Sequence, residues 1–218
     1  LYTVRKNGNI TAKTEEELLP SLREIEQRAA KEKRYSILFS NIMLIMMKNV
    51  HVAQGNMVKA VYCYSKTYPS NTEYNFNDFM DDGGSILEGM TPQQLHHVEA
   101  FIRQPNKSEF ELWLTENTVY NAATLYELEG TKFIREYSFD SAIIALKRAG
   151  KLKPILPDVM VSHLKDEQDL NSSDKTVFYT KLDFAKRMQE LEGKLRKNPK
   201  DSRAAYQYAN GLYSMSYY

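Results

Sequence analysis

Histidine and carboxylate side chains one helical turn apart are the first pattern in this chain that could perform chemistry. His96 and Glu99 have this spacing, so an imidazole and a carboxylate could bind one metal ion from the same helix face. No second pair of ligands accompanies them in the sequence, and a solvated helix face explains both residues. We therefore predict no metal site and no cofactor at this position.

Three aspartates beside a pair of glycines form the second candidate, a calcium loop. Asp78, Asp81 and Asp82 precede Gly83 and Gly84. The sequence lacks the alternating oxygen ligands and the distal glutamate that an EF-hand loop requires. We predict an irregular turn here rather than a calcium site.

Nucleophiles and general bases are equally sparse. Cys63 precedes Tyr64 in an apolar helical pattern, where a thiol packs as a small apolar side chain. His51 is predicted to be a packed imidazole with one hydrogen bond, and His163 lies in a polar loop without a visible partner. A Gly-rich phosphate loop, a G-x-S-x-G elbow and an H-E-x-x-H helix are all absent from the sequence. These observations predict a protein that is not an enzyme.

The composition limits the classes of partner. The chain has 218 residues, of which 42% are hydrophobic and 26% are charged, as in ordinary globular proteins. The formal net charge of +1 gives no long-range field to attract nucleic acid or an anionic membrane. The single cysteine excludes an internal disulfide. We expect no nucleic-acid partner.

The longest apolar run extends from Tyr35 to Met47 and is interrupted by Ser36, Ser40 and Asn41. A membrane-spanning helix needs about 20 apolar residues. We therefore predict a buried helix and no direct membrane insertion. The chain starts without a methionine and ends in an aromatic stretch, so we expect a fragment of a longer protein.

Apolar residues recur at intervals of three and four along most of the chain, which predicts an all-α fold. Pro20 lies inside the first helical pattern, so that helix either begins near Leu19 or kinks. Irregular insertions are expected near residues 68–90 and 155–178. Residues 1–218 are predicted to form a single domain. Three pairs of residues have the spacing of helix N-terminal caps: Thr14 with Glu17, Thr91 with Pro92, and Ser108 with Glu111.

The stretch from Gly130 to Pro154 carries the clearest long-range pattern. Small, large apolar and helix-breaking residues occur there at defined intervals: Gly130, Phe133, Ala142, Leu146, Ala149 and Pro154. Small residues let two helices approach closely, large ones fill the space between neighbours, and proline ends the second helix. This pattern resembles the tetratricopeptide repeat, a helix-turn-helix unit of about 34 residues. The resemblance implies antiparallel helix pairs stacked as an irregular TPR-like α-α superhelix.

The resemblance covers the chain unevenly. It is good over Val119–Pro154, moderate over Leu38–Thr67 and partial over Arg196–Tyr218. The segments ELEGTKFIREYSFDSAI and AAYQYANGLYSMSYY are also similar to stretches of long uncharacterised exported proteins of Bacteroidetes bacteria. This second similarity favours a periplasmic or exported location over a cytoplasmic one.

Tetratricopeptide proteins bind partners on the concave face that is formed by the first helix of each pair. The resemblance implies that six residues of the present chain lie on this face: Asn49, Thr131, Arg135, Tyr206, Asn210 and Tyr213. It implies a non-catalytic scaffold that binds a protein or peptide. The alternatives are a structural spacer in a larger exported protein and a metal- or carbohydrate-binding helical module.

Overall fold

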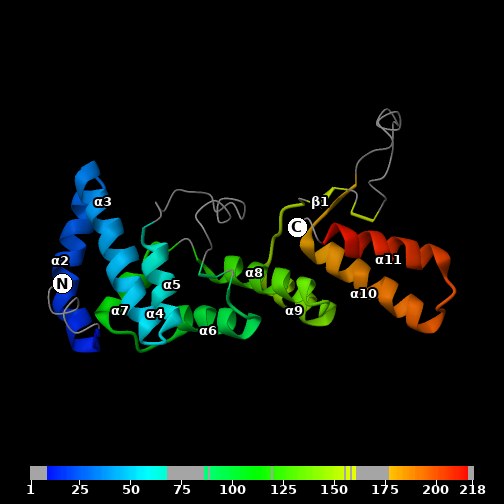
Figure 1. Ribbon diagram of the computed structural model, residues 1–218, viewed down its shortest axis with the longest axis horizontal. Coiled ribbons are helices and arrows are strands. Elements are labelled where there is room, and N and C mark those ends of the chain that lie inside the picture. The colour runs from blue at the N-terminus through cyan, green and yellow to red at the C-terminus, as the bar shows by residue number, and fades with distance from the viewer. Residues whose placement is uncertain are drawn as a thin grey trace. The chain divides into compact units, whose positions relative to one another are not determined.

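The computed structural model describes residues 9–67, 86–87, 89–118, 120–154, 156–157, 159–160 and 177–215. The chain forms two compact units, Leu1–Ala122 and Ala123–Tyr218 (Figure 1), and each is described by itself below. Within the described residues, strands are limited to the antiparallel pair β1, Leu156–Pro157, and β2, Phe178–Tyr179. The prediction of an all-α fold is confirmed. The expected insertions near 68–90 and 155–178 lie mostly outside the described residues, and the single domain stays a prediction.

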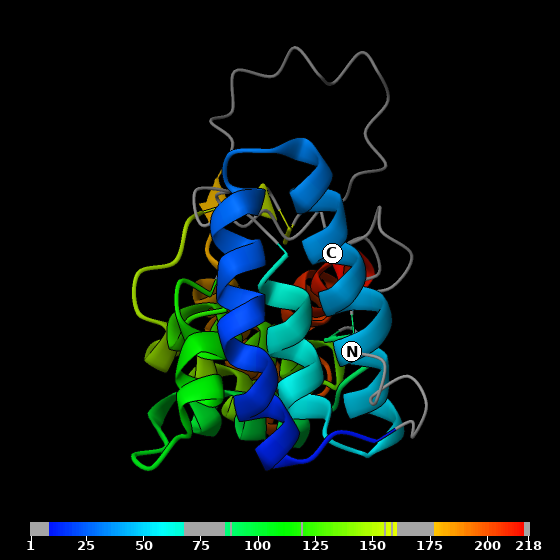
Figure 2. The ribbon, with the colours of Figure 1, turned by 90° about the vertical axis from the view of Figure 1, so that its left-hand side faces the viewer.

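The first unit is built from helices that pack around α5. α2 lies along α3 and also contacts α7, while α5 contacts α4, α6 and α7. Figure 2 faces this unit and shows α2 connected to α3 by a short turn. Its elements are α2 (Ala12–Ala29), α3 (Lys33–Asn41), the π-helix η1 (Ile42–Met47), α4 (Lys48–Ala53), α5 (Met57–Ser65), α6 (Pro92–Arg103) and α7 (Glu109–Thr115).

Side-chain caps fix where these helices begin. Thr91 and Ser108 both form capping boxes, with Gln94 and Glu111 as the third helical residues, so both predicted starts are confirmed. The predicted cap at Thr14 is wrong, because Thr11 is the N-cap residue and its hydroxyl accepts a hydrogen bond from the Thr14 amide.

Pro20 lies inside α2 and does not start it. The helix begins at Ala12 and continues to Ala29, so the predicted start near Leu19 is wrong. Proline removes the bond from its own nitrogen to the carbonyl of Glu16, four residues earlier. Leu19 and Leu22 on either side of it are buried, and this packing holds the helix together across the missing bond.

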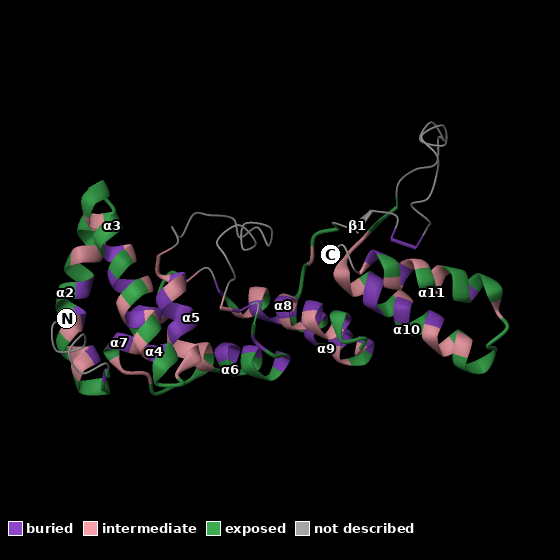
Figure 3. Ribbon diagram, viewed as in Figure 1, coloured by how far each residue is buried: buried purple, intermediate pink, exposed green. Residues whose placement is uncertain are grey.

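A single helix of 21 residues, Lys33–Ala53, combines α3, η1 and α4. By length and composition alone it could cross a membrane, a test that core helices and signal sequences also pass. Only 28% of its most apolar 18-residue window is buried, so the prediction of a buried helix is wrong. Figure 3 shows buried and exposed positions alternating around this helix. One side belongs to the core, and the other is exposed.

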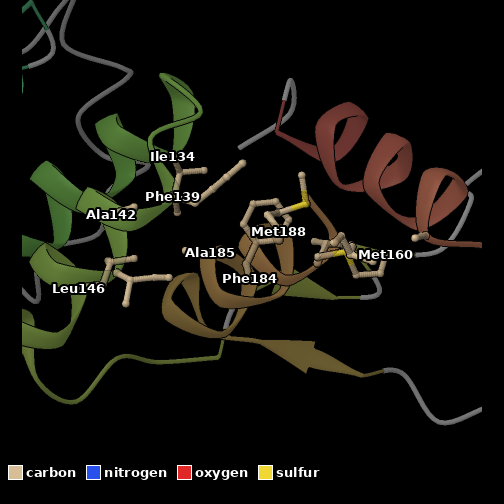
Figure 4. Packing of buried hydrophobic residues seen from close by; sticks show 12 residues of the cluster. Ile134, Phe139, Ala142, Leu146, Met160, Phe184, Ala185 and Met188 are labelled. Carbon is tan, nitrogen blue, oxygen red and sulfur yellow. The ribbon is translucent and has the colours of Figure 1, made fainter. Parts of the chain in front are cut away.

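The second unit consists of two helical hairpins and the β1–β2 pair. α9 packs against α10, and α10 packs against α11. Figure 4 shows Ile134, Phe139 and Leu146 pointing from α8 and α9 toward Phe184 and Met188 on α10. These residues form one hydrophobic core. The helices are α8 (Ala122–Arg135), α9 (Phe139–Ala149), α10 (Lys181–Lys197) and α11 (Ser202–Ser214).

α8 and α9 make their close approach at Gly130. A methyl group added there would overlap Leu146 of α9, with its Cδ2 at 2.7 Å, and would lie 3.3 Å from the carbonyl oxygen of Ala142. Ala142 itself is completely buried. Tyr137 has a φ of 58° in the turn between the two helices, the left-handed conformation that ends many helices. The spacing of small residues in the sequence therefore corresponds to a real helix crossing.

Two glycines inside helices of this unit make a matched test of the crossing. We expect Gly130→Ala to lower the free energy of unfolding by about 1–3 kcal/mol, because the added methyl overpacks the contact with Leu146. Gly193→Ala, where nothing lies within 4 Å of the added methyl, should instead raise it by up to about 1 kcal/mol through helix propensity. Urea unfolding followed by circular dichroism measures both values. Equal effects of the two substitutions would contradict the close approach.

Candidate functional site

The residues that could bind metal do not converge on a site. His96 is exposed, whereas Glu99 is buried and its Oε1 lies 2.6 Å from Nε of Arg103. No group of three or more His, Cys, Asp and Glu side chains that could hold a metal ion occurs among the residues that the structure describes. Asp78, Asp81, Asp82 and His163 lie outside those residues.

The six predicted contact residues fall in different surroundings. Asn49 is exposed on α4, in the first unit. Tyr206 and Tyr213 are exposed on α11, whereas Asn210 between them is half-buried and donates a 3.4 Å hydrogen bond to the carbonyl oxygen of Met160. α11 forms a hairpin with α10 and is thus the second helix of that pair in chain order.

Thr131 and Arg135 lie together at an apolar recess in the second unit. The recess has a volume of about 40 Å³. α8 and α10 form its sides. Ser214 at the end of α11, Met215 after it and the turn at Val159 complete it. Its lining residues are Thr131, Ile134, Arg135, Val159, Lys181, Phe184, Ser214 and Met215.

Polar groups around the recess are engaged with the protein itself. The Thr131 hydroxyl donates to the carbonyl oxygen of Glu127 at 2.8 Å, and the Ser214 hydroxyl donates to that of Val159 at 3.1 Å. Nζ of Lys181 lies 2.9 Å from Oε1 of Glu127, which ties α10 to α8. The interior of the recess is therefore left to Ile134, Phe184 and other apolar side chains.

The size and walls of the recess define what it can accept. One water molecule needs about 10–15 Å³ by this measure, so about 40 Å³ holds a few waters or one small branched aliphatic group. Apolar walls give water few hydrogen-bond partners. An aliphatic side chain therefore fits this recess better than solvent does.

Sequence reasoning found two lining residues and missed those on α10 and at the end of α11. Lys181 and Phe184 belong to a helix that the repeat pattern left unassigned, because 45 residues rather than 34 separate Pro154 from Pro199. The sequence signal for this wall of the recess is the aromatic residue Phe184 three positions after Lys181, which the structure shows to be buried. A helical pattern in α10 gives no information about its neighbour across the insertion.

A buried cluster of charged side chains joins four helices of the first unit. Lys59 of α5 lies at its centre, with Nζ 2.7 Å from Oε2 of Glu15 on α2 and 3.0 Å from Oε1 of Glu111 on α7. Nε2 of His51 on α4 lies 3.6 Å from Oε1 of Glu15. Glu15 and His51 are both almost fully buried. A buried cation with two carboxylates around it is stable only while its partners stay in place.

A second charged contact repeats this arrangement farther along α2. Oε1 of Glu26 lies 2.9 Å from Nζ of Lys66, and Oε2 accepts a 2.6 Å hydrogen bond from Nε1 of Trp113. Lys59 of α5 and Lys66, the C-cap residue of α5, each also lie over an aromatic ring of α7. The distances from Nζ to the ring centroid are 5.8 Å for Lys59 over Phe110 and 4.8 Å for Lys66 over Trp113.

The burial of this cluster shifts its protonation equilibria. Burial and the nearby Lys59 cation lower the pKa of His51 to about 4, and burial raises the pKa of Glu15. Burial opposes the charge of Lys59, yet hydrogen bonds to Glu15 and Glu111 raise its pKa overall. Burial also raises the pKa of the Cys63 thiol, which disfavours a nucleophilic thiolate. The cluster therefore holds α2 in place against α5 and α7.

Comparison with protein-family models, curated proteins and solved structures gives no match to this chain. The resemblance of Val119–Pro154 to tetratricopeptide repeats stays a prediction from the sequence.

Loss of the central cation should destabilise the first unit. We expect Lys59→Met to lower the free energy of unfolding by about 3–5 kcal/mol, because Glu15 and Glu111 would face each other without a cation. The matched control is Lys13→Met, which removes an exposed lysine whose Nζ lies 3.9 Å from Glu17 and should change the value by less than about 1 kcal/mol. Chemical denaturation monitored by Trp113 fluorescence measures both. A small effect of Lys59→Met would show that the cluster contributes little.

The low pKa of His51 predicts loss of stability in mild acid. The unfolded chain binds this proton near the ordinary pKa of 6.5, whereas the folded chain does so near 4, so stability falls as the pH drops through this window. At about 1.4 kcal/mol per pKa unit, the loss approaches about 3 kcal/mol. The raised pKa of Glu15 acts in the opposite direction and reduces it.

Denaturant unfolding of the intact chain at a series of pH values, followed by Trp113 fluorescence, measures this dependence. His51→Gln should be less stable at neutral pH but should show a flatter profile between pH 6.5 and 4, because glutamine does not titrate. Parallel profiles for the two proteins would contradict the assignment to His51.

Proposed function

We propose that this chain is a non-catalytic scaffold of the tetratricopeptide-like class that binds a protein or peptide. The observation that carries the proposal is the apolar recess between α8 and α10, beside Thr131 and Arg135. The resemblance to tetratricopeptide repeats predicts these two contact residues from the sequence alone, independently of the recess. An aliphatic side chain of an extended partner segment is the group that the recess fits.

The arrangement of the second unit supports the repeat class. α8 and α10 begin successive hairpins, α9 packs against α10, and the ion pair between Lys181 and Glu127 links the two first helices. In tetratricopeptide proteins, first helices of neighbouring pairs line the binding face. A recess with walls from α8 and α10 has the position expected for such a face.

Peptide selection against the intact chain tests the proposal. Random 12-residue peptides displayed on phage are selected on the immobilised protein, and affinities of the enriched sequences are measured by fluorescence anisotropy. We expect enrichment of peptides with a small branched aliphatic residue. Thr131→Leu should weaken their binding by about tenfold or more, because the larger side chain occupies the recess.

The control variant is Ile144→Ser, which changes an exposed aliphatic residue of α9 that is 55% accessible and should leave affinity unchanged. Failure to enrich any peptide would favour the structural spacer. Enriched peptides whose binding responds to Tyr206→Ser and not to Thr131→Leu would place the binding face on α11 and contradict the recess.

A further inference from the structure

The long helix of the first unit carries a straight exposed row of side chains. Ile37, Asn41, Ile45 and Asn49 follow one another at intervals of four residues, and all four are exposed. Ile37 is 55% and Ile45 62% accessible, which is unusual for isoleucine. Leu38 and Val52, also exposed, flank this row; the six residues together are called the outer face below. It is independent of the recess in the second unit.

The π-helix explains why the row is straight. In an α-helix with 3.6 residues per turn, each step of four residues rotates by about 40° beyond a full turn, so such a row winds around the helix. The wider turns of η1 reduce this rotation. Phe39, Met43, Met47 and His51 form the matching buried row.

The geometry of the outer face fits a helix. Rows of side chains four residues apart are ridges that pack into grooves on a second helix. From Ile37 to Asn49 the row spans about 18 Å at 1.5 Å per residue. The backbone of the helix offers no edge to which an extended strand could add. A partner helix of three or more turns would cover this face.

The charges of the helix identify the sign of the partner. Between Lys33 and Ala53 the only charged residues are Lys33, Arg34 and Lys48, and there is no carboxylate. Nε of Arg34 lies 3.0 Å from Oε2 of Glu32, which precedes the helix. A second copy of the chain would bring lysines against lysines, which disfavours self-association. A partner with acidic residues beside its apolar ridge would be attracted.

The two asparagines favour a protein partner over a lipid surface. Asn41 and Asn49 alternate with isoleucine along the row. Contact with hydrocarbon would bury their amides without hydrogen-bond partners, which costs free energy. A polar side chain on a partner helix can bond them and fix the register, as a buried asparagine does in coiled coils.

We propose that the outer face binds an acidic amphipathic helix of another protein. Isoleucine side chains supply the apolar contact, and Asn41 and Asn49 set the register. Lys33 and Lys48 select carboxylates on the partner. This inference goes beyond the proposed function, because it assigns a second binding surface with its own partner chemistry.

Two synthetic helical peptides test the proposal on the intact chain. Both are 21 residues long and carry the same leucine ridge, but the flanking positions are glutamate in one and lysine in the other. We expect the acidic peptide to bind more tightly than the basic one by about tenfold or more at low salt, with the difference decreasing as salt is added. Isothermal titration calorimetry measures both affinities.

Substitutions on the outer face make the test specific. Ile45→Glu should weaken binding of the acidic peptide by about tenfold or more. Ile144→Glu, at a similarly exposed isoleucine of α9, should leave that affinity unchanged. The double variant Lys33→Glu with Lys48→Glu should bind the basic peptide better than the acidic one. Because these side chains are not fully buried, the variants should keep the unchanged chain's circular dichroism, which is recorded for each.

Four results would overturn the proposal. The first is equal affinity for the two peptides, and the second is no binding of either. The third is concentration-dependent dimerisation that Ile45→Glu abolishes, measured by sedimentation equilibrium, which would assign the face to a second copy. The fourth is binding to phosphatidylglycerol vesicles that Ile45→Glu abolishes while the acidic peptide does not bind, which would assign it to a membrane surface.

Discussion

The attachment of α2 to α5 and α7 is the constraint on which the first unit depends. One face of α2 carries Glu15, Leu19, Leu22 and Glu26. The two glutamates pair with Lys59 of α5 and with Lys66 at its C-cap, and both lysines lie over aromatic rings of α7. Two buried leucines between two charged contacts fix α2 both along its axis and around it. Purely apolar contacts would leave the helix freer to slide, because they have no directional requirement.

The second unit is held by close packing rather than by charge. Gly130 lets α8 approach α9, and Met188 lies against Gly211 where α10 meets α11. Small residues at both crossings allow the hairpins to share one core. A recess of about 40 Å³ remains beside Thr131, since Ile134 and Phe184 do not fill the space between α8 and α10. The recess therefore follows from helix packing.

Local signals predicted the helices well, and long-range contacts decided what they left open. Thr11 and Thr14 have similar capping potential, and Thr11 is used because Gln54 holds the backbone of Ile10 through two hydrogen bonds. The apolar run Tyr35–Met47 predicted a helix here, but it could not show which side the core covers. Glu15 and Glu26 lie 44 and 40 residues before their partners Lys59 and Lys66, so no local pattern indicates these two contacts.

The π-helix η1 sets the positions of both the exposed row and the buried row of the helix Lys33–Ala53. Phe39 and His51 lie on one side because the wider turns of η1 offset the rotation that ordinary α-helical turns would accumulate between them. Deleting one residue within η1 would let the helix return to ordinary α-helical turns, and at about 100° per residue His51 would then stay within about 20° of the side that carries Phe39. The loss of one residue in this segment therefore preserves both rows, whereas the same change elsewhere in the helix would rotate everything that follows by about 100°.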